Sequence, residues 1–217
     1  MIVDERVSCY IKSLTVYNSD FLEKLREKAL EAKVPIIKRE TESFLKTLLL
    51  LKKPKRILEV GAAVAYSSLV MAETLEGNVK ISTIENYEKR VLEARKNIAD
   101  SHYSNIIHLI EEDASKVLKE LVEKEEKYDF IFMDAAKGQY INWLEPVIKL
   151  LNKEGVLCSD NVLQGGDIVQ SRYLIERRDR SIHSRLREYL YELTHREELS
   201  TTILSLGDGV ALTVLKK

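Results

Sequence analysis

Two apolar runs of this chain each end in side chains that carry oxygen. Residues 130–133 are followed directly by Asp134, and residues 155–159 lead into Asp160 and Asn161. If the two runs form neighbouring strands, their ends lie about 5 Å apart, so two carboxylates and one amide could hold a single cation. Oxygen donors suit Mg²⁺, whereas zinc would require Cys or His nearby. The alternative is that Asp134 caps a helix and the other two side chains belong to a turn.

Lys137 follows Asp134 by three residues and could take part in the same chemistry. A divalent cation that binds a hydroxyl oxygen lowers the pKa of that hydroxyl. A nearby lysine that the cation keeps neutral could accept the proton, and the resulting oxyanion could attack a sulfonium methyl in line. Most lysines are solvated surface residues, so the spacing alone leaves that simpler interpretation open.

Acidic side chains also mark the ends of three earlier strand-like runs. Glu59 precedes Gly61 in the first, Glu85 follows the second, and Asp113 with Ala114 follows the third. A glycine just past a strand lets a ligand approach the backbone closely, but the other glycines of a pyrophosphate-binding loop are missing. Acids here would suit a cationic amine, the ribose hydroxyls and an adenine edge, which together describe S-adenosylmethionine. Taken singly, each acid could equally be a helix cap or a solvated loop residue.

The hydrophobic pattern predicts the elements that must position these side chains. Residues 1–53 have helical spacing, and after Pro54 short β-rich runs alternate with helical stretches, which is typical of a parallel sheet with helices on both faces. Residues 207–209 (Gly-Asp-Gly) predict the turn of a closing antiparallel hairpin. The expected strands are 56–60, 79–84, 106–110, 128–133, 155–159, 199–204 and 210–215, and the expected helices are 66–75, 87–100, 114–123, a segment through 151 and a long one through 193.

We therefore expect one Rossmann-like α/β domain. Its doubly wound, mostly parallel seven-stranded sheet would span residues 54–217 and end in the hairpin, with a helical N-terminal extension at residues 1–53. Ligands of such sheets bind at the carboxyl ends of the strands.

Composition excludes several classes of protein. The formal net charge of −1 over 217 residues indicates no bulk attraction to nucleic acid, although a local basic patch remains compatible with it. Cys9 and Cys158 are too few for a disulfide framework and favour a reducing compartment. The N-terminus carries no signal-peptide pattern, and the apolar run 48–51 is far too short to span a membrane. We expect a cytoplasmic protein without a membrane segment.

Three segments resemble motifs of the cation-dependent O-methyltransferases, the family of catechol and caffeoyl-coenzyme A O-methyltransferases. They are ILEVGAAVAYSS (57–68), DFIFMDAAKGQY (129–140) and SDNVLQGG (159–166), and the resemblance runs from about residue 35 to the C-terminus. One position departs from the pattern, because Ala65 stands where the family usually has a second glycine. Its methyl group is expected to tighten the approach of the methionine tail.

The resemblance implies a role for each matching residue. Asp134 is expected to serve the cofactor site and catalysis as well as the metal, which is Mg²⁺ or Mn²⁺. The implied set is Ile37 in a segment that closes over the cofactor, Glu59, Gly61 and Ser67 at the methionine part of S-adenosylmethionine, Glu85 at the ribose, Asp113 and Ala114 at the adenine, Asp134, Asp160 and Asn161 at the metal, and Lys137 as the base.

The methyl acceptor is the least determined part of the sequence analysis. The chain most resembles the bacterial branch, part of which methylates 5-hydroxyuridine at the wobble position of transfer RNA (tRNA) to give 5-methoxyuridine. Residues 172–187 contain six arginines against two acids, and Arg172, Arg177, Arg178 and Arg180 are the candidates for binding an anticodon loop. A solvated helix face, or a site for coenzyme A phosphates, would explain the same arginines.

Two other functions compete with a tRNA methyltransferase. A small-molecule catechol or phenol O-methyltransferase would use the same metal-assisted mechanism, because a catechol and 5-hydroxyuridine both present two adjacent oxygens. A non-catalytic nucleotide-binding module is the third, since fold alone does not establish catalysis. By resemblance we also expect a homodimer, for which the apolar residues Val7, Tyr10, Ile11 and Leu14 of the N-terminal extension could supply an interface.

Overall fold

A seven-stranded sheet forms the centre of the chain, whose residues 4–216 are described by the computed structural model. The strand order is β3-β2-β1-β4-β5-β7-β6; β1 to β5 are parallel, and β7 pairs antiparallel with both β5 and β6. The expected Rossmann-like sheet with a C-terminal hairpin is therefore confirmed. The strands are β1 Arg56–Val60, β2 Lys80–Ile84, β3 Ile107–Ile110, β4 Tyr128–Met133, β5 Leu151–Asp160, β6 Leu199–Leu204 and β7 Val210–Leu215.

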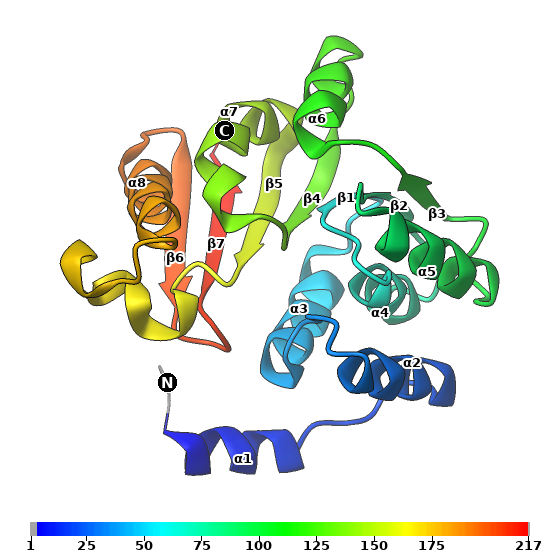
Figure 1. Cartoon of the computed structure of the whole chain (residues 1–217). Coiled ribbons are helices and arrows are strands. Elements are labelled where there is room, and N and C mark those ends of the chain that lie inside the picture. The colour runs from blue at the N-terminus through cyan, green and yellow to red at the C-terminus, as the bar shows by residue number, and fades with distance from the viewer. Residues whose placement is uncertain (1–3, 217) are drawn as a thin grey trace.

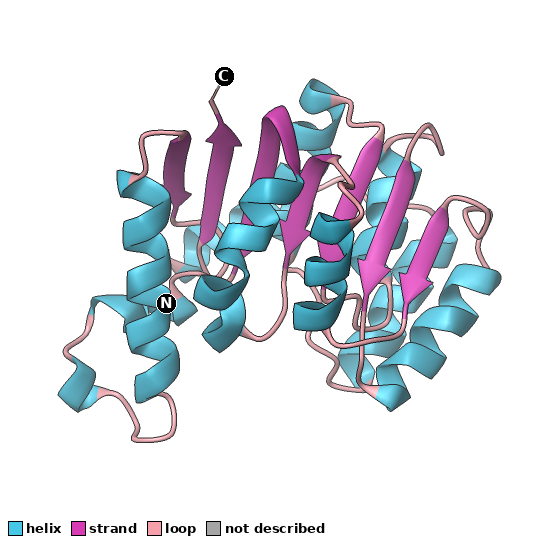
Figure 2. Ribbon diagram, turned by 90° about the horizontal axis from the view of Figure 1, so that it is seen from above, coloured by secondary structure: helices cyan, strands magenta, loops and turns pink. Residues whose placement is uncertain are grey.

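Helices cover both faces of the sheet (Figure 1, Figure 2). One face packs against α3, α4 and α5, with α2 behind α4, and the other packs against α6, α7 and α8. The helices are α1 Glu5–Ser13, α2 Asp20–Glu31, α3 Arg39–Lys52, α4 Tyr66–Thr74, α5 Glu88–Ala99, α6 Ala114–Glu123, α7 Tyr140–Leu150 and α8 Arg180–His195, with short 3₁₀ turns η1 Lys137–Gln139, η2 Gln164–Val169 and η3 Arg172–Leu174.

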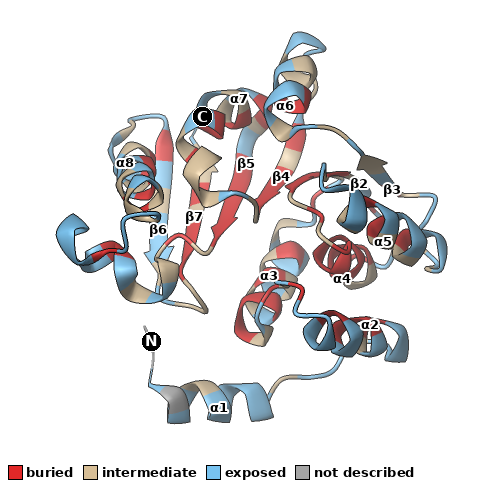
Figure 3. Cartoon of the chain, viewed as in Figure 1, coloured by how far each residue is buried: buried red, intermediate tan, exposed pale blue. Residues whose placement is uncertain are grey.

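Strand β4 shows why the central runs are apolar throughout. Successive side chains point to opposite faces of a strand, so Phe130 and Phe132 enter one hydrophobic core while Ile131 and Met133 enter the other. All four are completely buried (Figure 3). A strand covered on both sides has no solvated face, and the apolar pattern stops only where the strand leaves the sheet, at Asp134.

The N-terminal helix α1 lies apart from the sheet and packs on α3 (Figure 1). Its polar contacts to the body converge on Glu40, whose carboxylate accepts a hydrogen bond from Ser8 and lies 3.5 Å from Lys12 Nζ. Tyr10 of α1 and Leu14, which follows the helix, are 66% and 63% exposed, so the surface on which the homodimer expectation rests faces solvent in the single chain.

The expected long helix after residue 159 was wrong in its first half. Residues 161–179 form a loop with the turns η2 and η3, and α8 begins only at Arg180. Gly165 and Gly166 both have positive φ (63° and 107°), which no α-helix contains, and the Ser171 hydroxyl accepts from the Tyr173 amide to close a separate turn. Strand β5 is also longer than expected, since Leu151 already pairs with Tyr128 before an irregularity in the register.

No helix within residues 4–216 combines the length and the apolar character that crossing a lipid bilayer requires. This finding agrees with the short apolar runs of the sequence.

Gly61 fixes the distance between the ends of β1 and β4, and its replacement should break the fold locally. It adopts φ +101°, and a Cβ there would collide with the carbonyl oxygen of Asp134. We expect Gly61→Ala to lower the free energy of unfolding by about 3 kcal/mol or more, the sum of left-handed strain and backbone overpacking.

Gly77→Ala is the matched control, because φ is +74° there but the nearest atom, Tyr103 Cε1, is 3.8 Å from the added Cβ. It should show only the strain of about 1–2 kcal/mol. Denaturant unfolding measures both variants, and equal losses would contradict the role given to the Asp134 contact.

Candidate active site

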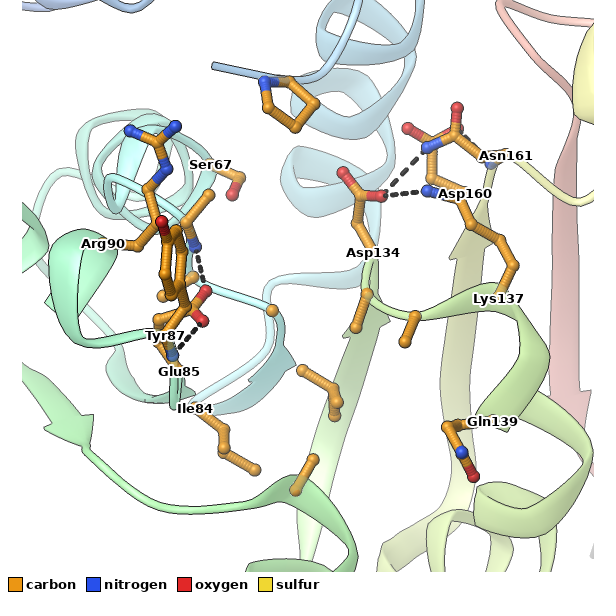
Figure 4. Close-up of a pocket in the computed structure, with 18 of the residues that line it drawn as sticks. Ser67, Ile84, Glu85, Tyr87, Arg90, Asp134, Lys137, Gln139, Asp160 and Asn161 are labelled. Atoms are coloured by element: carbon orange, nitrogen blue, oxygen red, sulfur yellow. Dashed lines mark hydrogen bonds and ion pairs between the residues drawn. The ribbon is translucent and has the colours of Figure 1, made fainter.

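One cavity of about 920 Å³ opens at the carboxyl ends of the central strands. Residues after β1, β2, β4 and β5 line it, and residues 35–38 with Thr41 form its roof at the start of α3. Figure 4 shows Glu85, Tyr87 and Arg90 on one side of the cavity and Asp134, Lys137, Asp160 and Asn161 on the other. The cavity thus brings the predicted metal residues and, except for Glu59, the predicted cofactor residues into one space.

Glu85 is held in place by backbone amides at the end of β2. Its Oε2 accepts from the Ala63 amide at 2.8 Å, and its Oε1 accepts from the amides of Asn86 and Tyr87 at 3.0 Å each. Three amide donors fix the carboxylate without using all of its acceptor positions, so it can still bind hydroxyls in the cavity. Tyr87, which is 59% exposed, stands beside it at the rim and was missed by the sequence analysis.

Glu59 lies behind the cavity wall and does not line the cavity, contrary to the expected direct contact with the methionine part. It is completely buried, and its carboxylate accepts hydrogen bonds from the hydroxyls of Ser67, Ser68 and Thr83. Burial raises the pKa of Glu59, an effect opposed by the three hydroxyl donors. Ser67 itself lines the cavity, so Glu59 acts on the site by orienting that hydroxyl.

The backbone of the loop from Gly61 to Ala65 takes conformations that favour glycine at two positions. Gly61 lines the cavity and adopts a positive φ next to Asp134. Ala65 also has a left-handed backbone (φ +63°), the conformation that glycine adopts at no steric cost. Its methyl group is fully buried in the core and does not reach the cavity, so the expected crowding of the methionine tail was wrong. The substitution acts through backbone strain instead.

The end of the cavity at α6 contains Asp113, Ala114 and Ser115. Asp113 is the N-cap of α6 and accepts from the Ser115 amide at 2.9 Å, so the helix-cap interpretation of this residue is correct and coexists with its place in the cavity. Trp143 donates from Nε1 to the Ser115 hydroxyl at 3.0 Å and adds an aromatic wall that the sequence analysis did not identify.

The three predicted metal donors meet at the ends of β4 and β5. These strands are adjacent, with Met133 opposite Ser159, so Asp134 and Asp160 follow side by side. The Asn161 side chain donates from Nδ2 to Asp134 Oδ1 at 2.9 Å. The Asn161 backbone N–H donates to Asp160 Oδ1 at 2.8 Å. Asn161 adopts a left-handed backbone (φ +61°) that turns its side chain back over the pair.

The carboxylates of Asp134 and Asp160 have too little positive charge around them to balance their own. Asp160 is only 3% exposed, and its burial and the neighbouring charge of Asp134 raise the pKa of Asp160 to about 7. Lys137 Nζ lies 3.6 Å from Asp134 Oδ1 and is the nearest cation among the described ion pairs of the site. A divalent cation would relieve this repulsion, so the charge of the site fits a metal.

The donor atoms also suit a hard cation. Two carboxylates and an amide offer only oxygen ligands, provided that the Asn161 amide turns its oxygen toward the carboxylates. No cluster of three or more His, Cys, Asp or Glu side chains that could hold a metal occurs among residues 4–216. The oxygen donors Asp134, Asp160 and Asn161 are of the kind that Mg²⁺ or Mn²⁺ prefers, and three protein ligands would leave coordination positions for other ligands.

Tyr140 fixes the two metal-donor segments relative to each other, a role the sequence analysis missed. Its fully buried hydroxyl accepts from the Ala135 amide at 3.1 Å. The same hydroxyl lies 3.0 Å from the carbonyl oxygen of Met133 and 3.2 Å from that of Asp160, to which it donates. Burial raises the pKa of Tyr140 far above its usual value, so the phenol keeps the proton that it donates.

The roof of the cavity meets the hairpin turn at its mouth. Ile37 is buried and lines the cavity, as expected for a covering segment, and Lys38 Nζ lies 2.7 Å from Asp208 Oδ1 in the turn between β6 and β7. Gly207 in this turn packs against Thr41, whose hydroxyl would lie 2.6 Å from an added Cβ. Two segments that are far apart in the sequence thus close one side of the mouth.

The four candidate RNA-binding arginines lie outside the cavity and differ in their contacts. Arg178 is paired with Glu176 at 3.0 Å, and Arg180 donates to the carbonyl oxygens of Ile175 and Tyr173. Within residues 4–216, by contrast, no hydrogen bond or ion pair engages the exposed side chains of Arg172 and Arg177. Only the latter two are free to meet a ligand without losing a contact.

Comparisons with known proteins identify the family. The family model described as O-methyltransferase matches residues 12–217. The catechol O-methyltransferase of Niastella koreensis is 30% identical over 168 residues, which is 76% of each chain. A Staphylococcus aureus structure named for caffeoyl-CoA O-methyltransferase is 31% identical with a TM-score of 0.88, covering 98% of this chain and 100% of the other. The O-methyltransferase of Bacillus cereus, solved in complex with S-adenosylhomocysteine, is 24% identical with a TM-score of 0.84 and 97% coverage of both chains.

The family match extends over nearly the whole chain, and the Staphylococcus aureus structure shares both its fold and almost a third of its residues. The chain therefore belongs to the O-methyltransferase family and is an S-adenosylmethionine-dependent O-methyltransferase of the caffeoyl-CoA and catechol type.

Proposed function

We propose that the cavity binds S-adenosylmethionine beside one divalent cation and that the enzyme methylates a hydroxyl with a second oxygen next to it. The observation that carries this proposal is the convergence of Asp134, Asp160 and Asn161 in the same cavity as Glu85. A methyl donor bound along Glu85 and an acceptor bound at the carboxylate pair would meet in the middle of this space.

The methyl donor would be held along the ends of β1, β2 and β3. Glu85 would bind the ribose hydroxyls, Ala114 and Asp113 would face the adenine, and Ser67 would bind the methionine part under the roof at Ile37. The Bacillus cereus relative holds S-adenosylhomocysteine, which supports a donor site in this fold. S-adenosylmethionine supplies a methyl group on a positively charged sulfur, and the acids around the cavity favour that charge.

The acceptor would be activated at the ends of β4 and β5. Asp134, Asp160 and Asn161 would hold Mg²⁺ or Mn²⁺, and the cation would supply the Lewis acidity that lowers the pKa of an acceptor hydroxyl. Lys137 would take the hydroxyl proton, since its Nζ stands beside Asp134 at the edge of the cavity. Tyr140 would keep both carboxylate-bearing segments in register during the reaction.

For the acceptor we propose 5-hydroxyuridine at the wobble position of tRNA, with 5-methoxyuridine as the product. Its 5-hydroxyl and 4-carbonyl provide the adjacent oxygens. Arg185 of α8 donates to the Gly138 carbonyl at 3.0 Å, so the arginine-rich segment approaches the chain immediately after Lys137. Arg172, Arg177 and Arg187 are exposed in the same segment, and their guanidinium groups would bind phosphates or stack on unpaired bases of a bound tRNA.

A small catechol is the second candidate acceptor, and the Niastella koreensis relative is the observation that favours it. The same carboxylate pair and lysine would act on it without using the arginines. Methyl transfer from labelled S-adenosylmethionine to hypomodified tRNA, compared with transfer to a simple catechol, separates the two. Nucleoside mass analysis should show 5-hydroxyuridine replaced by 5-methoxyuridine; transfer to catechol alone would reject the tRNA acceptor.

Replacement of Asp134 by alanine should separate catalysis from donor binding. We expect Asp134→Ala to reduce kcat by about 10³-fold, the scale of losing one transition-state electrostatic contact, while the Kd for S-adenosylhomocysteine changes much less. Steady-state rates and calorimetry measure the two effects. Asp167→Asn, on the exposed turn η2, is the control and should retain the parent rate. A fully active Asp134→Ala enzyme would contradict the metal assignment.

The stability of the protein should respond to divalent cation in a pH-dependent way. The pKa of Asp160 is raised to about 7 in the folded chain against a usual 3.8, so folded protein binds this proton more tightly than unfolded protein. Without cation, stability therefore falls as pH rises between these values, by up to about 1.4 kcal/mol per pH unit. A cation that binds the ionised pair should offset this loss.

Thermal melts with and without Mg²⁺ at pH 5.5 and 8 check this expectation, and the rise in Tm on adding Mg²⁺ should be larger at pH 8. Asp160→Asn removes the titrating carboxylate and should make the Mg²⁺ effect small at both pH values. A Mg²⁺ effect that is equal at the two pH values in the parent protein would count against a cation bound at Asp160.

The unpaired arginines should matter for tRNA and not for a catechol. We expect the double replacement Arg172→Ala with Arg177→Ala to lower kcat/KM for tRNA by about tenfold or more and to flatten its salt dependence, because phosphate contacts are lost. Turnover of a catechol should stay within about twofold, since these side chains do not line the cavity. Lys24→Ala with Arg95→Ala, the same charge change on α2 and α5, is the control. Equal losses in the two double variants would reject a specific RNA surface.

A further inference from the structure

A buried network of polar side chains connects the roof of the cavity to its opposite wall. Glu42 on α3 lies at its centre and is completely buried. Its Oε1 accepts from Asn18 Nδ2 at 2.7 Å and from Arg39 Nη1 at 3.1 Å. Its Oε2 accepts from the Tyr66 hydroxyl at 2.7 Å and from Arg26 Nη1 at 3.3 Å. One carboxylate therefore links α2, α3, α4 and the segment before α2.

The network reaches the cavity at two points. Arg26 Nη1 also donates to the carbonyl oxygen of Ile37 at 3.0 Å, and Ile37 belongs to the roof. On the other side, Tyr66 lines the cavity at the start of α4, directly before Ser67. The Arg26 guanidinium carbon lies 5.5 Å from the centre of the Tyr66 ring, which closes the link between the two walls. Glu42 and Arg26 themselves do not line the cavity.

The buried charges of the network are better explained by a need to hold its residues in one geometry than by a gain in folding stability. Well-packed apolar side chains would often stabilise a core as well as a buried ion pair does, whereas removing one partner leaves a costly unpaired charge. Burial and the charge of Glu42 both raise the pKa of Tyr66, so the phenol stays protonated and keeps donating to the carboxylate. Every member of the network is thus held in one arrangement, and the roof is held with it.

We propose that Glu42 is a positioning residue for the methyl donor. Through Arg26 it fixes the roof at Ile37, and through Tyr66 it fixes the start of α4 at Ser67, so the donor half of the cavity has its final width before the donor binds. This inference rests on the assignment of that half to S-adenosylmethionine. Preorganisation of this kind strengthens binding by removing the cost of ordering the site.

Tyr66→Phe and Tyr128→Phe form the central test. Tyr66→Phe removes one hydroxyl bound to a buried carboxylate, so the Kd for S-adenosylhomocysteine should rise about tenfold, while kcat at saturating donor stays within about twofold. Tyr128 is equally buried but stands at the start of β4, the end of the strand away from the cavity. Tyr128→Phe should lower Tm to a similar extent and leave the Kd unchanged.

Two further variants test whether Tyr66 acts through Glu42. Glu42→Gln should weaken S-adenosylhomocysteine binding at least as much as Tyr66→Phe, and the double variant should bind no more weakly than Glu42→Gln alone. If Glu42→Gln does not fold, Arg26→Lys replaces it. An ammonium group lacks the planar guanidinium whose Nη1 donates to Ile37 and Glu42 while its carbon lies over the Tyr66 ring. The same non-additivity with Tyr66→Phe is expected.

Three results would overturn the proposal: parent-like binding by Tyr66→Phe, equal weakening by Tyr128→Phe, or fully additive effects of the two network substitutions. Additive effects would mean that Tyr66 contacts the donor independently of Glu42. Failure of the parent protein to bind S-adenosylhomocysteine is a different outcome, which would reject the donor site itself.

Discussion

Repulsion between two neighbouring carboxylates governs the design of this active site. The parallel pairing of β4 and β5 places Asp134 and Asp160 at the same edge of the sheet, and the burial of Asp160 prevents water from screening them. Such a pair costs stability unless positive charge is supplied, and Lys137 supplies only part of it. The folded chain therefore has an excess of negative charge at the ends of β4 and β5, which a positively charged ligand in the cavity would relieve.

The backbone carries as much of the site as the side chains do. Gly61, Ala65 and Asn161 all have positive φ: Gly61 and Asn161 turn the chain directly after β1 and β5, and Ala65 is the N-cap of α4. Such turns let β1 approach Asp134 closely and swing Asn161 back over the carboxylates. The Tyr140 hydroxyl then bonds the backbone next to Asp134 and the carbonyl of Asp160, so two strand ends and one buried phenol hold the two carboxylates in place.

Two kinds of feature could be predicted from the sequence: regular hydrophobic patterns, and charged residues that end an apolar run. The strands followed from apolar runs, and Asp134 and Asp160 stood out because a charged residue terminates each run. The helix expected across residues 160–179 was wrong because two consecutive glycines take left-handed conformations there, which hydrophobic spacing does not report. Glu59 looked like a ligand-binding acid because its hydroxyl partners come from other elements, and the contacts of Glu42 and Tyr140 were invisible for the same reason. Contacts between segments that are distant in the sequence produce no hydrophobic pattern from which they could be predicted.

The ion pair between Lys38 and Asp208 bears on how reactants enter and leave. Both side chains are partly exposed, and such pairs contribute about 0–1 kcal/mol, which is close to thermal energy. An ion pair of that strength breaks and re-forms readily, so it does not by itself keep the hairpin turn closed over the mouth. An acceptor that extends beyond the cavity would therefore meet no strong electrostatic barrier on this side of the mouth.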